Sequence, residues 1–201
     1  MNKEIQFIDS RYNKLFTVPD GGNIVVTQFD GEKLVRPCQF IDDIHFGSGG
    51  YVFHACQFAE IMERDGAVYA PEIVKPGDCI DTYEIYQIAD TRGTDYCFRP
   101  FGEAEKQIKR GDYKRVYAGM LAPQTTMEFL FVKHNRDNRP FGKQMRSLTM
   151  SDVIVLGRAG KQQALYVDTF GYKEVPGFLG PKPEKDGPHK AVKKRGREYE
   201  R

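Results

Sequence analysis

Apolar residues in the first part of the chain fall into short runs with the spacing of β-strands. FTV leads through turn residues 19–22 into NIVVTQF, and Asp30-Gly31 separates that run from EKLVR. Both residues of an Asp-Gly pair readily adopt the positive φ angles of a tight hairpin turn. The pattern therefore predicts a β-hairpin around Asp30-Gly31.

The next segment has the spacing of an amphipathic helix. Apolar residues recur at three- and four-residue intervals through YVFHACQFAEIM. Ser48 precedes this run and can cap a helix, and Gly66 follows it and can end one, because glycine adopts the left-handed conformation without strain. We predict a helix from Gly50 to Asp65.

A second group of elements follows the connector AVYAPEIVKPGDC, which contains two prolines and a glycine. TYEIYQI, DYCFRPF and YKRVYAGML favour strands, and GEAEKQIKRGDY favours a short helix that ends at Gly111. Residues 125–135 have the apolar spacing of a helix with a threonine cap. DVIVL and QALYVDTF are predicted to form a hairpin around Gly157–Gly160.

Together these elements predict an α+β protein with antiparallel sheets and a few packed helices. We expect a hairpin-plus-helix module at residues 1–78, a second module at residues 79–180 and a flexible basic tail at residues 181–201. The tail is rich in Lys, Pro, Gly and Glu, and it has too few apolar residues to offset the entropy lost on ordering.

The net charge of +2 conceals an asymmetry along the chain. Residues 181–201 hold eight of the 30 basic and four of the 28 acidic residues, a net charge of +4, so the rest of the chain has a net charge of −2. Clustered cations can neutralise phosphates and release counterions, which gives salt-sensitive affinity for nucleic acid. The candidate contacts are Lys190, Lys193, Lys194, Arg195 and Arg197. The alternative is a tail that aids solubility or contacts an acidic protein.

The composition indicates an ordinary globular protein of the cytoplasm. The sequence is 40% hydrophobic and 29% charged, with no apolar run of the roughly 18 residues that suggests a membrane span. The N-terminal residues lack the apolar core of a signal peptide. The four cysteines form no C-x-x-C pair, and we expect them to be reduced and mostly buried.

A zinc site can be imagined from Cys38, His45, His54 and Cys56. His54 and Cys56 lie two residues apart on the predicted helix and therefore point to different sides, which does not suit a tetrahedral ion. We predict neither a metal nor any other cofactor.

Other candidates for chemistry are also weak. Residues 47–50 (GSGG) resemble an anion-binding turn but lack the lysine of a P-loop, and a capped start of a helix explains them. Neither Cys56 nor Cys97 has a local signature of a nucleophile paired with histidine. Adjacent carboxylates such as Asp42-Asp43 point apart on an extended chain, so we predict no catalytic residue.

Ser151-Asp152 directly precedes the apolar run VIVL, and Asp168 directly follows another. Short polar side chains at such places bond to neighbouring backbone groups and mark where strands begin and end. A structural role at the ends of strands is therefore the simpler interpretation.

The C-terminal half resembles the YodL-like domain of Firmicutes. The resemblance lies in the Y-x-x-V-Y-x-G segment from Tyr113 to Gly119, in Ser147–Leu156 and in Tyr166–Phe178, in the family's order. It covers about residues 83–180, and it departs from the family at RPFGKQMRS, where members often have Gly-His before Ser-Leu. We expect the signature residues to be structural; they include Ser151, Asp152, Asp168, Gly171 and Pro176.

The resemblance implies a setting in mobile genetic elements such as conjugative elements, and it implies no assigned catalytic residues. Our leading hypothesis is a non-enzymatic protein that binds and inhibits or modulates a host protein, such as a defence factor of the CRISPR nuclease kind. The alternative is a nucleic-acid-binding factor for transfer or regulation that acts through the basic tail. An enzyme comes third.

Overall fold

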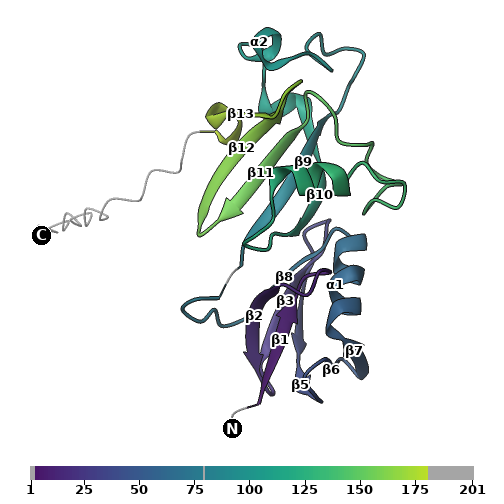
Figure 1. Ribbon diagram of the computed structural model, residues 1–201, viewed down its shortest axis with the longest axis vertical. Coiled ribbons are helices and arrows are strands. Elements are labelled where there is room, and N and C mark those ends of the chain that lie inside the picture. Colours follow the sequence, from purple (N-terminus) through teal and green to yellow (C-terminus); the bar gives the residue numbers. More distant parts are fainter. Residues whose placement is uncertain (1–2, 79, 181–201) are drawn as a thin grey trace, which may run out of the picture.

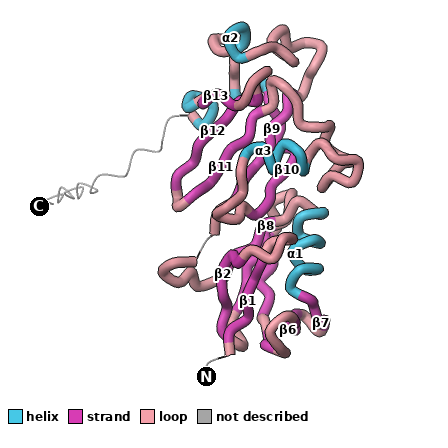
Figure 2. The backbone as a smooth tube through the Cα atoms, in the orientation of Figure 1, coloured by secondary structure: helices cyan, strands magenta, loops and turns pink. Residues whose placement is uncertain are grey.

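The computed structural model describes residues 3–78 and 80–180 of the chain. The five candidate nucleic-acid contacts, from Lys190 to Arg197, lie outside the described residues. The described part is an α+β protein, as predicted, with antiparallel sheets and short helices (Figures 1 and 2).

The N-terminal half contains eight strands in three small antiparallel sheets, with one helix alongside. The sheets have the orders β1-β2, β4-β3-β8 and β5-β6-β7. The elements are β1 Glu4–Ile8, β2 Lys14–Pro19, β3 Asn23–Thr27, β4 Lys33–Pro37, β5 Gln39–Phe40, β6 His45–Ser48, β7 Tyr51–His54, α1 Ala55–Arg64 and β8 Val68–Pro71.

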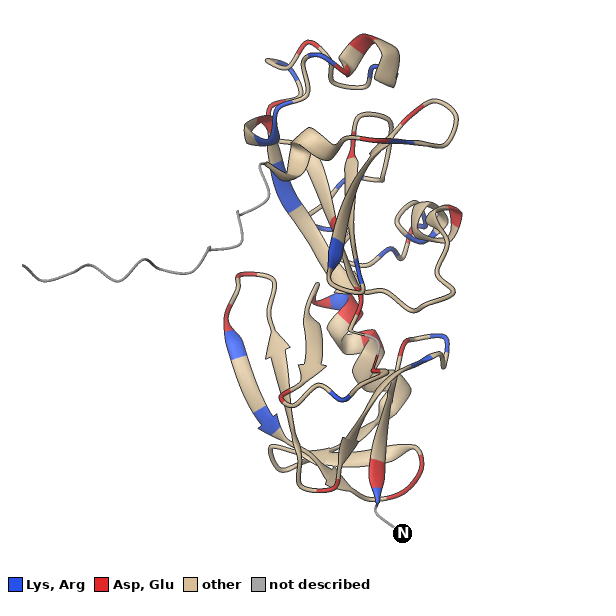
Figure 3. Cartoon of the chain, turned by 90° about the vertical axis from the view of Figure 1, so that its left-hand side faces the viewer, with Lys and Arg blue, Asp and Glu red and all other residues tan. Residues whose placement is uncertain are grey.

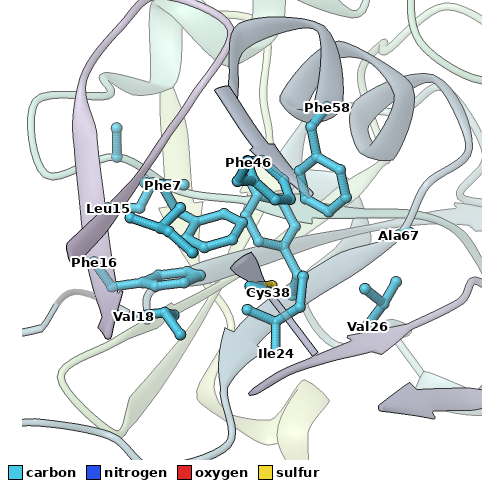
Figure 4. Packing of buried hydrophobic residues seen from close by; sticks show 13 residues of the cluster. Phe7, Leu15, Phe16, Val18, Ile24, Val26, Cys38, Phe46, Phe58 and Ala67 are labelled. Carbon is cyan, nitrogen blue, oxygen red and sulfur yellow. The ribbon is translucent and has the colours of Figure 1, made fainter. Parts of the chain in front are cut away.

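Aromatic side chains from all three sheets and from α1 form the core of this half (Figure 4). Phe7 stacks on Phe16 with ring centroids 5.0 Å apart, and Phe46 meets Phe58 of α1 edge-on at 5.3 Å. Ala122 of the C-terminal half belongs to the same cluster, so the two halves share part of a core.

A five-stranded antiparallel sheet of order β10-β9-β11-β12-β13 dominates the C-terminal half. Short helices flank it, and Figure 2 shows α3 beside the sheet and α2 at the far end from the N-terminus. The elements are β9 Thr82–Ile88, α2 Phe101–Ala104, η1 Arg110–Asp112, β10 Tyr113–Met120, α3 Met127–Lys133, β11 Val153–Arg158, β12 Lys161–Val167, β13 Tyr172–Glu174 and η2 Pro176–Leu179.

Several predicted elements are confirmed. β3 and β4 pair around Asp30-Gly31, with Gly31 at φ 95°. β11 and β12 form the second hairpin, and its turn is Ala159-Gly160 because Arg158 already pairs with Lys161. α3 lies inside the predicted range, and the Thr126 side chain caps it by accepting from the backbone N–H of Phe129.

The predicted helix from Gly50 to Asp65 is wrong in its first turn. Gly49 (φ 57°) and Gly50 (φ 83°) form the two-residue turn of a hairpin, so Tyr51–His54 pairs with β6 instead of starting a helix. α1 begins at Ala55, and its cap is the His54 side chain, not Ser48. The end at Gly66 (φ 62°) is as predicted.

Two further predictions fail in the segment between β9 and β10. DYCFRPF is not a strand: the N–H of Cys97 bonds to the carbonyl of Thr94, and Phe98 has a φ of 60°, so turns satisfy this backbone. The helix predicted to end at Gly111 ends at Ala104, and a separate 3-10 helix covers Arg110–Asp112.

Candidate functional site

Asp152, in the family signature, directly precedes β11 and is completely buried. Its carboxylate accepts from Arg146 Nη1 at 2.9 Å, from the Thr149 N–H at 2.9 Å and from Gln87 Nε2 at 3.0 Å. Burial raises the pKa of Asp152 to about 6, against the opposing effect of Arg146 and the hydrogen bonds. All these contacts lie within the domain, so the carboxylate ties β11 to β9 and to the preceding loop.

Ser151 is also completely buried and adopts a φ of 75°. Its hydroxyl accepts from the Phe98 N–H at 3.0 Å, and its carbonyl accepts from the Tyr113 hydroxyl at 3.0 Å. Ser151 therefore joins the turn segment before α2 to both β10 and β11.

The remaining signature residues lie at the end of β12 and beyond it. Asp168 directly follows β12 and accepts from the Phe101 N–H at 2.9 Å. Gly171, with φ 74°, belongs to the turn before β13, and Pro176 begins η2. Asp168 thus attaches the start of α2 to the end of β12, and Gly171 lies in the turn that connects β12 to β13.

Of the residues considered for metal or nucleophilic chemistry, His45 and His54 lie together as cross-strand partners, with ring centroids 5.3 Å apart. His45 lies 3.0 Å from Asp42, His54 caps α1, and the Cys56 thiol lies 3.9 Å from both the Ser10 carbonyl and Glu60. Within residues 3–78 and 80–180, no three His, Cys, Asp or Glu side chains are grouped to hold an ion.

The described cysteines Cys38, Cys56 and Cys97 are free thiols. Burial raises the pKa of Cys38 to about 11 and also raises the pKa of Cys97. A raised pKa leaves little of the reactive thiolate at neutral pH.

A polar cluster joins α1 of the N-terminal half to the C-terminal half. Glu63 forms an ion pair with Lys133 of α3, and its carbonyl accepts from the Tyr117 hydroxyl at 3.0 Å. His134 is completely buried beside them, with Nε2 2.9 Å from the Tyr83 hydroxyl. Burial lowers the pKa of His134 to about 3, helped by the nearby cations, so the ring is neutral at pH 7.

The N-terminal half carries a hollow of about 310 Å³ between β4, β7 and α1, which we call the β4–α1 hollow. Its inner surface is apolar, and a few polar side chains reach it at its edge. The residues that line it are Ile24, Val26, Gln28, Leu34, Arg36, Ser48, Tyr51, Phe53, Phe58, Ile61, Met62, Asp65 and Ala67.

Beside the hollow, the β6–β7 hairpin and the segment before it expose Ile41, Tyr51 and Val52, and we call these three residues the hairpin surface. Tyr51 and Ser48 also line a second depression, of about 370 Å³, with Ile41 and Val52. Tyr51 is 73% exposed and Val52 66% exposed, on opposite faces of β7, and exposure of this extent is unusual for large apolar side chains. The helical spacing had placed Val52 on a buried helix face, so sequence reasoning missed this surface.

No helix among the described residues is long and apolar enough to cross a membrane. Figure 3 shows positions of both charge signs in both halves. Within the described residues, the hairpin surface with the adjoining hollow is therefore our candidate site.

Comparison with known proteins identifies one part of this α+β protein. Residues 82–178 match the family model of the YodL-like domain, from the first residue of β9 into η2. The C-terminal half thus contains a YodL-like domain, and the signature residues lie inside it. No curated protein and no solved structure matches the chain.

Proposed function

We propose that the protein is a non-enzymatic accessory protein of a Firmicutes mobile genetic element that binds and inhibits or modulates a host protein, such as a defence factor. The observation that carries the proposal is the hairpin surface, which leaves large apolar side chains exposed around a hollow. The mobile-element setting is what resemblance to YodL-like proteins implies.

The exposed apolar side chains favour binding to a protein over other roles. Covering a side chain of this size contributes roughly 1.5–3 kcal/mol. Val52 lies beside Ile41, which is 46% exposed and lines the same depression, so one partner surface can cover both side chains. Hot spots of protein interfaces are built from such clustered anchors, with tyrosine among the favoured residues.

The test is an affinity purification from a Gram-positive host lysate with and without nuclease treatment. The baits are the full chain, a chain without residues 181–201, Val52→Asp and Phe170→Asp. Phe170 is 90% exposed in the C-terminal half, so Phe170→Asp is a matched control for adding a charge to an exposed apolar position.

We expect one host protein to survive nuclease and to be retained by the full chain, the truncated chain and Phe170→Asp, but lost by Val52→Asp. If nothing survives nuclease, or if Val52→Asp retains the same protein, the proposal is wrong. Recovery of nucleic acid that weakens steeply with salt and requires residues 181–201 would support the alternative, a nucleic-acid-binding factor.

A further inference from the structure

The chemistry of the partner follows from the free edge of β4, and this inference rests on the proposed function. β4 is the last strand of the sheet β4-β3-β8. Hydrogen bonds from the Gln28 N–H to Glu32 and from the Cys38 N–H to Gly22 flank the β3–β4 ladder. Bonded pairs alternate in an antiparallel ladder, so Leu34 and Arg36 bond to β3 and Val35 does not.

The backbone of Val35 is therefore directed away from the sheet. Its N–H and carbonyl form no hydrogen bond within residues 3–78 and 80–180. Lys33 lies two residues earlier and presents its backbone in the same direction. An unpaired edge of this kind is a template for one more strand.

The side chains of β4 place the β4–α1 hollow beside this edge. Leu34 and Arg36 line the hollow, whereas Val35 is on the other face and is 55% exposed. A strand added to β4 would therefore place every second side chain over the hollow. The volume of about 310 Å³ is at the lower end of the range for ligand pockets, which suits an apolar side chain with its neighbours.

Arg36 supplies the charge that selects the partner. Its side chain has no carboxylate partner within the described residues, and Nη1 lies 3.1 Å from where a Cβ on Gly49 would be. The guanidinium thus lies against the turn of the β6–β7 hairpin, at the edge of an apolar hollow. Opposite charges on facing positions of adjacent strands stabilise pairing.

We propose that the partner presents an extended segment that adds to the free edge of β4. Two of its side chains, two residues apart, face the β4–α1 hollow. One is large and apolar and lies beside Leu34, and the other is Asp or Glu and pairs with Arg36. The backbone of Val35 forms the hydrogen bonds to this segment.

The probe for this proposal is a phage-displayed library of random 12-residue peptides, selected on the full chain. Selected peptides are then synthesised with a fluorophore, and their affinity is measured by anisotropy. We expect an apolar residue and an acidic residue two positions apart in the selected sequences.

Variants of β4 test the binding mode. Val35→Pro removes the free N–H without removing a bond to β3, and proline is tolerated in edge strands. We expect it to weaken peptide binding about tenfold or more, as loss of a hydrogen bond of roughly 1.4 kcal/mol would. Val35→Thr keeps the N–H and the branched side chain, and should bind within about twofold of the unchanged protein. Arg36→Gln should weaken acidic peptides but not their Gln-substituted versions.

NMR measurement of amide hydrogen exchange on the unchanged protein tests the same bond without a variant. The Val35 amide should exchange more slowly when the peptide is bound. The inference is overturned if no peptide is selected, if selected peptides lack the pattern, if Val35→Pro binds them unchanged, or if the Val35 amide is not protected.

Retention of the host protein by these variants in the affinity purification distinguishes failure of this inference from failure of the proposed function. If that protein is lost by Val52→Asp but retained by both Val35→Pro and Arg36→Gln, the binding function stands and strand addition is wrong. If the protein is lost by Val52→Asp, Val35→Pro and Arg36→Gln but retained by Val35→Thr, the inference is supported.

Discussion

The YodL-like domain and the N-terminal half use arginine in opposite ways. Arg146 directs its guanidinium inward to the buried carboxylate of Asp152. Arg36 has no carboxylate within the described residues and lies beside an apolar hollow. The signature residues of the family thus hold the domain together, whereas the hairpin surface and the free edge of β4 lie outside the matched region.

The sharpest test of this contrast is removal of the buried carboxylate. Asp152→Ala leaves Arg146, Gln87 and the Thr149 N–H without their acceptor. We expect the free energy of unfolding in urea to fall by about 3 kcal/mol or more. Arg36→Ala, the matched change in the N-terminal half, should change it by less than about 0.5 kcal/mol. Equal losses of unfolding free energy for the two variants would show that the two arginines do not differ in this way.

A pH titration of stability tests how closed the C-terminal half is around His134. The pKa of His134 is about 3 when folded, below its usual value of 6.5, so the unfolded chain binds the proton first as pH falls. Stability from this group is present above pH 6.5 and is lost between pH 6.5 and about 3, by up to about 1.4 kcal/mol per pH unit.

Asp152 has the opposite dependence, because its folded pKa is raised to about 6 and its contribution is lost as pH rises through that value. The comparison is therefore between the unchanged protein and His134→Gln, which keeps an acceptor for Tyr83. Between pH 6.5 and pH 4.5, the free energy of unfolding in urea should fall less for His134→Gln than for the unchanged protein. An identical loss would mean that His134 is accessible to protons in the folded state.

A smaller effect is expected at the turn of the β6–β7 hairpin. Gly50 has a φ of 83°, and a Cβ there would meet no atom within 4 Å, so Gly50→Ala acts through the backbone alone. We expect a loss of about 1–2 kcal/mol in unfolding free energy. Gly102→Ala is the control, since Gly102 also has open space but no positive φ, and it should have little effect. Circular dichroism during heating measures both.

The smallest effect on stability should come from the hairpin surface itself. Val52→Ser replaces an apolar side chain that is 66% exposed, so the free energy of unfolding should change by less than about 0.5 kcal/mol. Binding of the host protein should nevertheless weaken clearly. A destabilisation of 2 kcal/mol would show instead that Val52 packs inside the fold.

Local sequence chemistry predicted the elements whose turns and caps are specific. Asp30-Gly31 specified its hairpin, and Thr126 specified the start of α3, because each signal lies within a few residues. The helix predicted for residues 51–54 was wrong because YVFH fits a strand as well as a helix. Only the turn at Gly49-Gly50 decides between the two. The strand predicted for DYCFRPF was wrong because Ser151, which is distant in sequence, accepts a hydrogen bond from the Phe98 N–H.

The candidate site could not be predicted in the same way. The β4–α1 hollow combines residues of β3, β4, β7 and α1, and it depends on how two of the small sheets pack with α1. No spacing along the chain encodes a free strand edge, because an edge is defined by which strand is absent beside it. The unpaired state of Arg36 is likewise a property of the fold.

β7 ends at His54 and α1 begins at Ala55, with no residue between them. The helix is 10 residues long, or about 15 Å, and its far end carries Glu63, which contacts Tyr117 and Lys133. α1 is therefore a short rigid connection between the hairpin surface and the YodL-like domain. A protein bound at the hairpin surface is kept at a fixed distance and orientation from any molecule that the YodL-like domain contacts at the other end of α1.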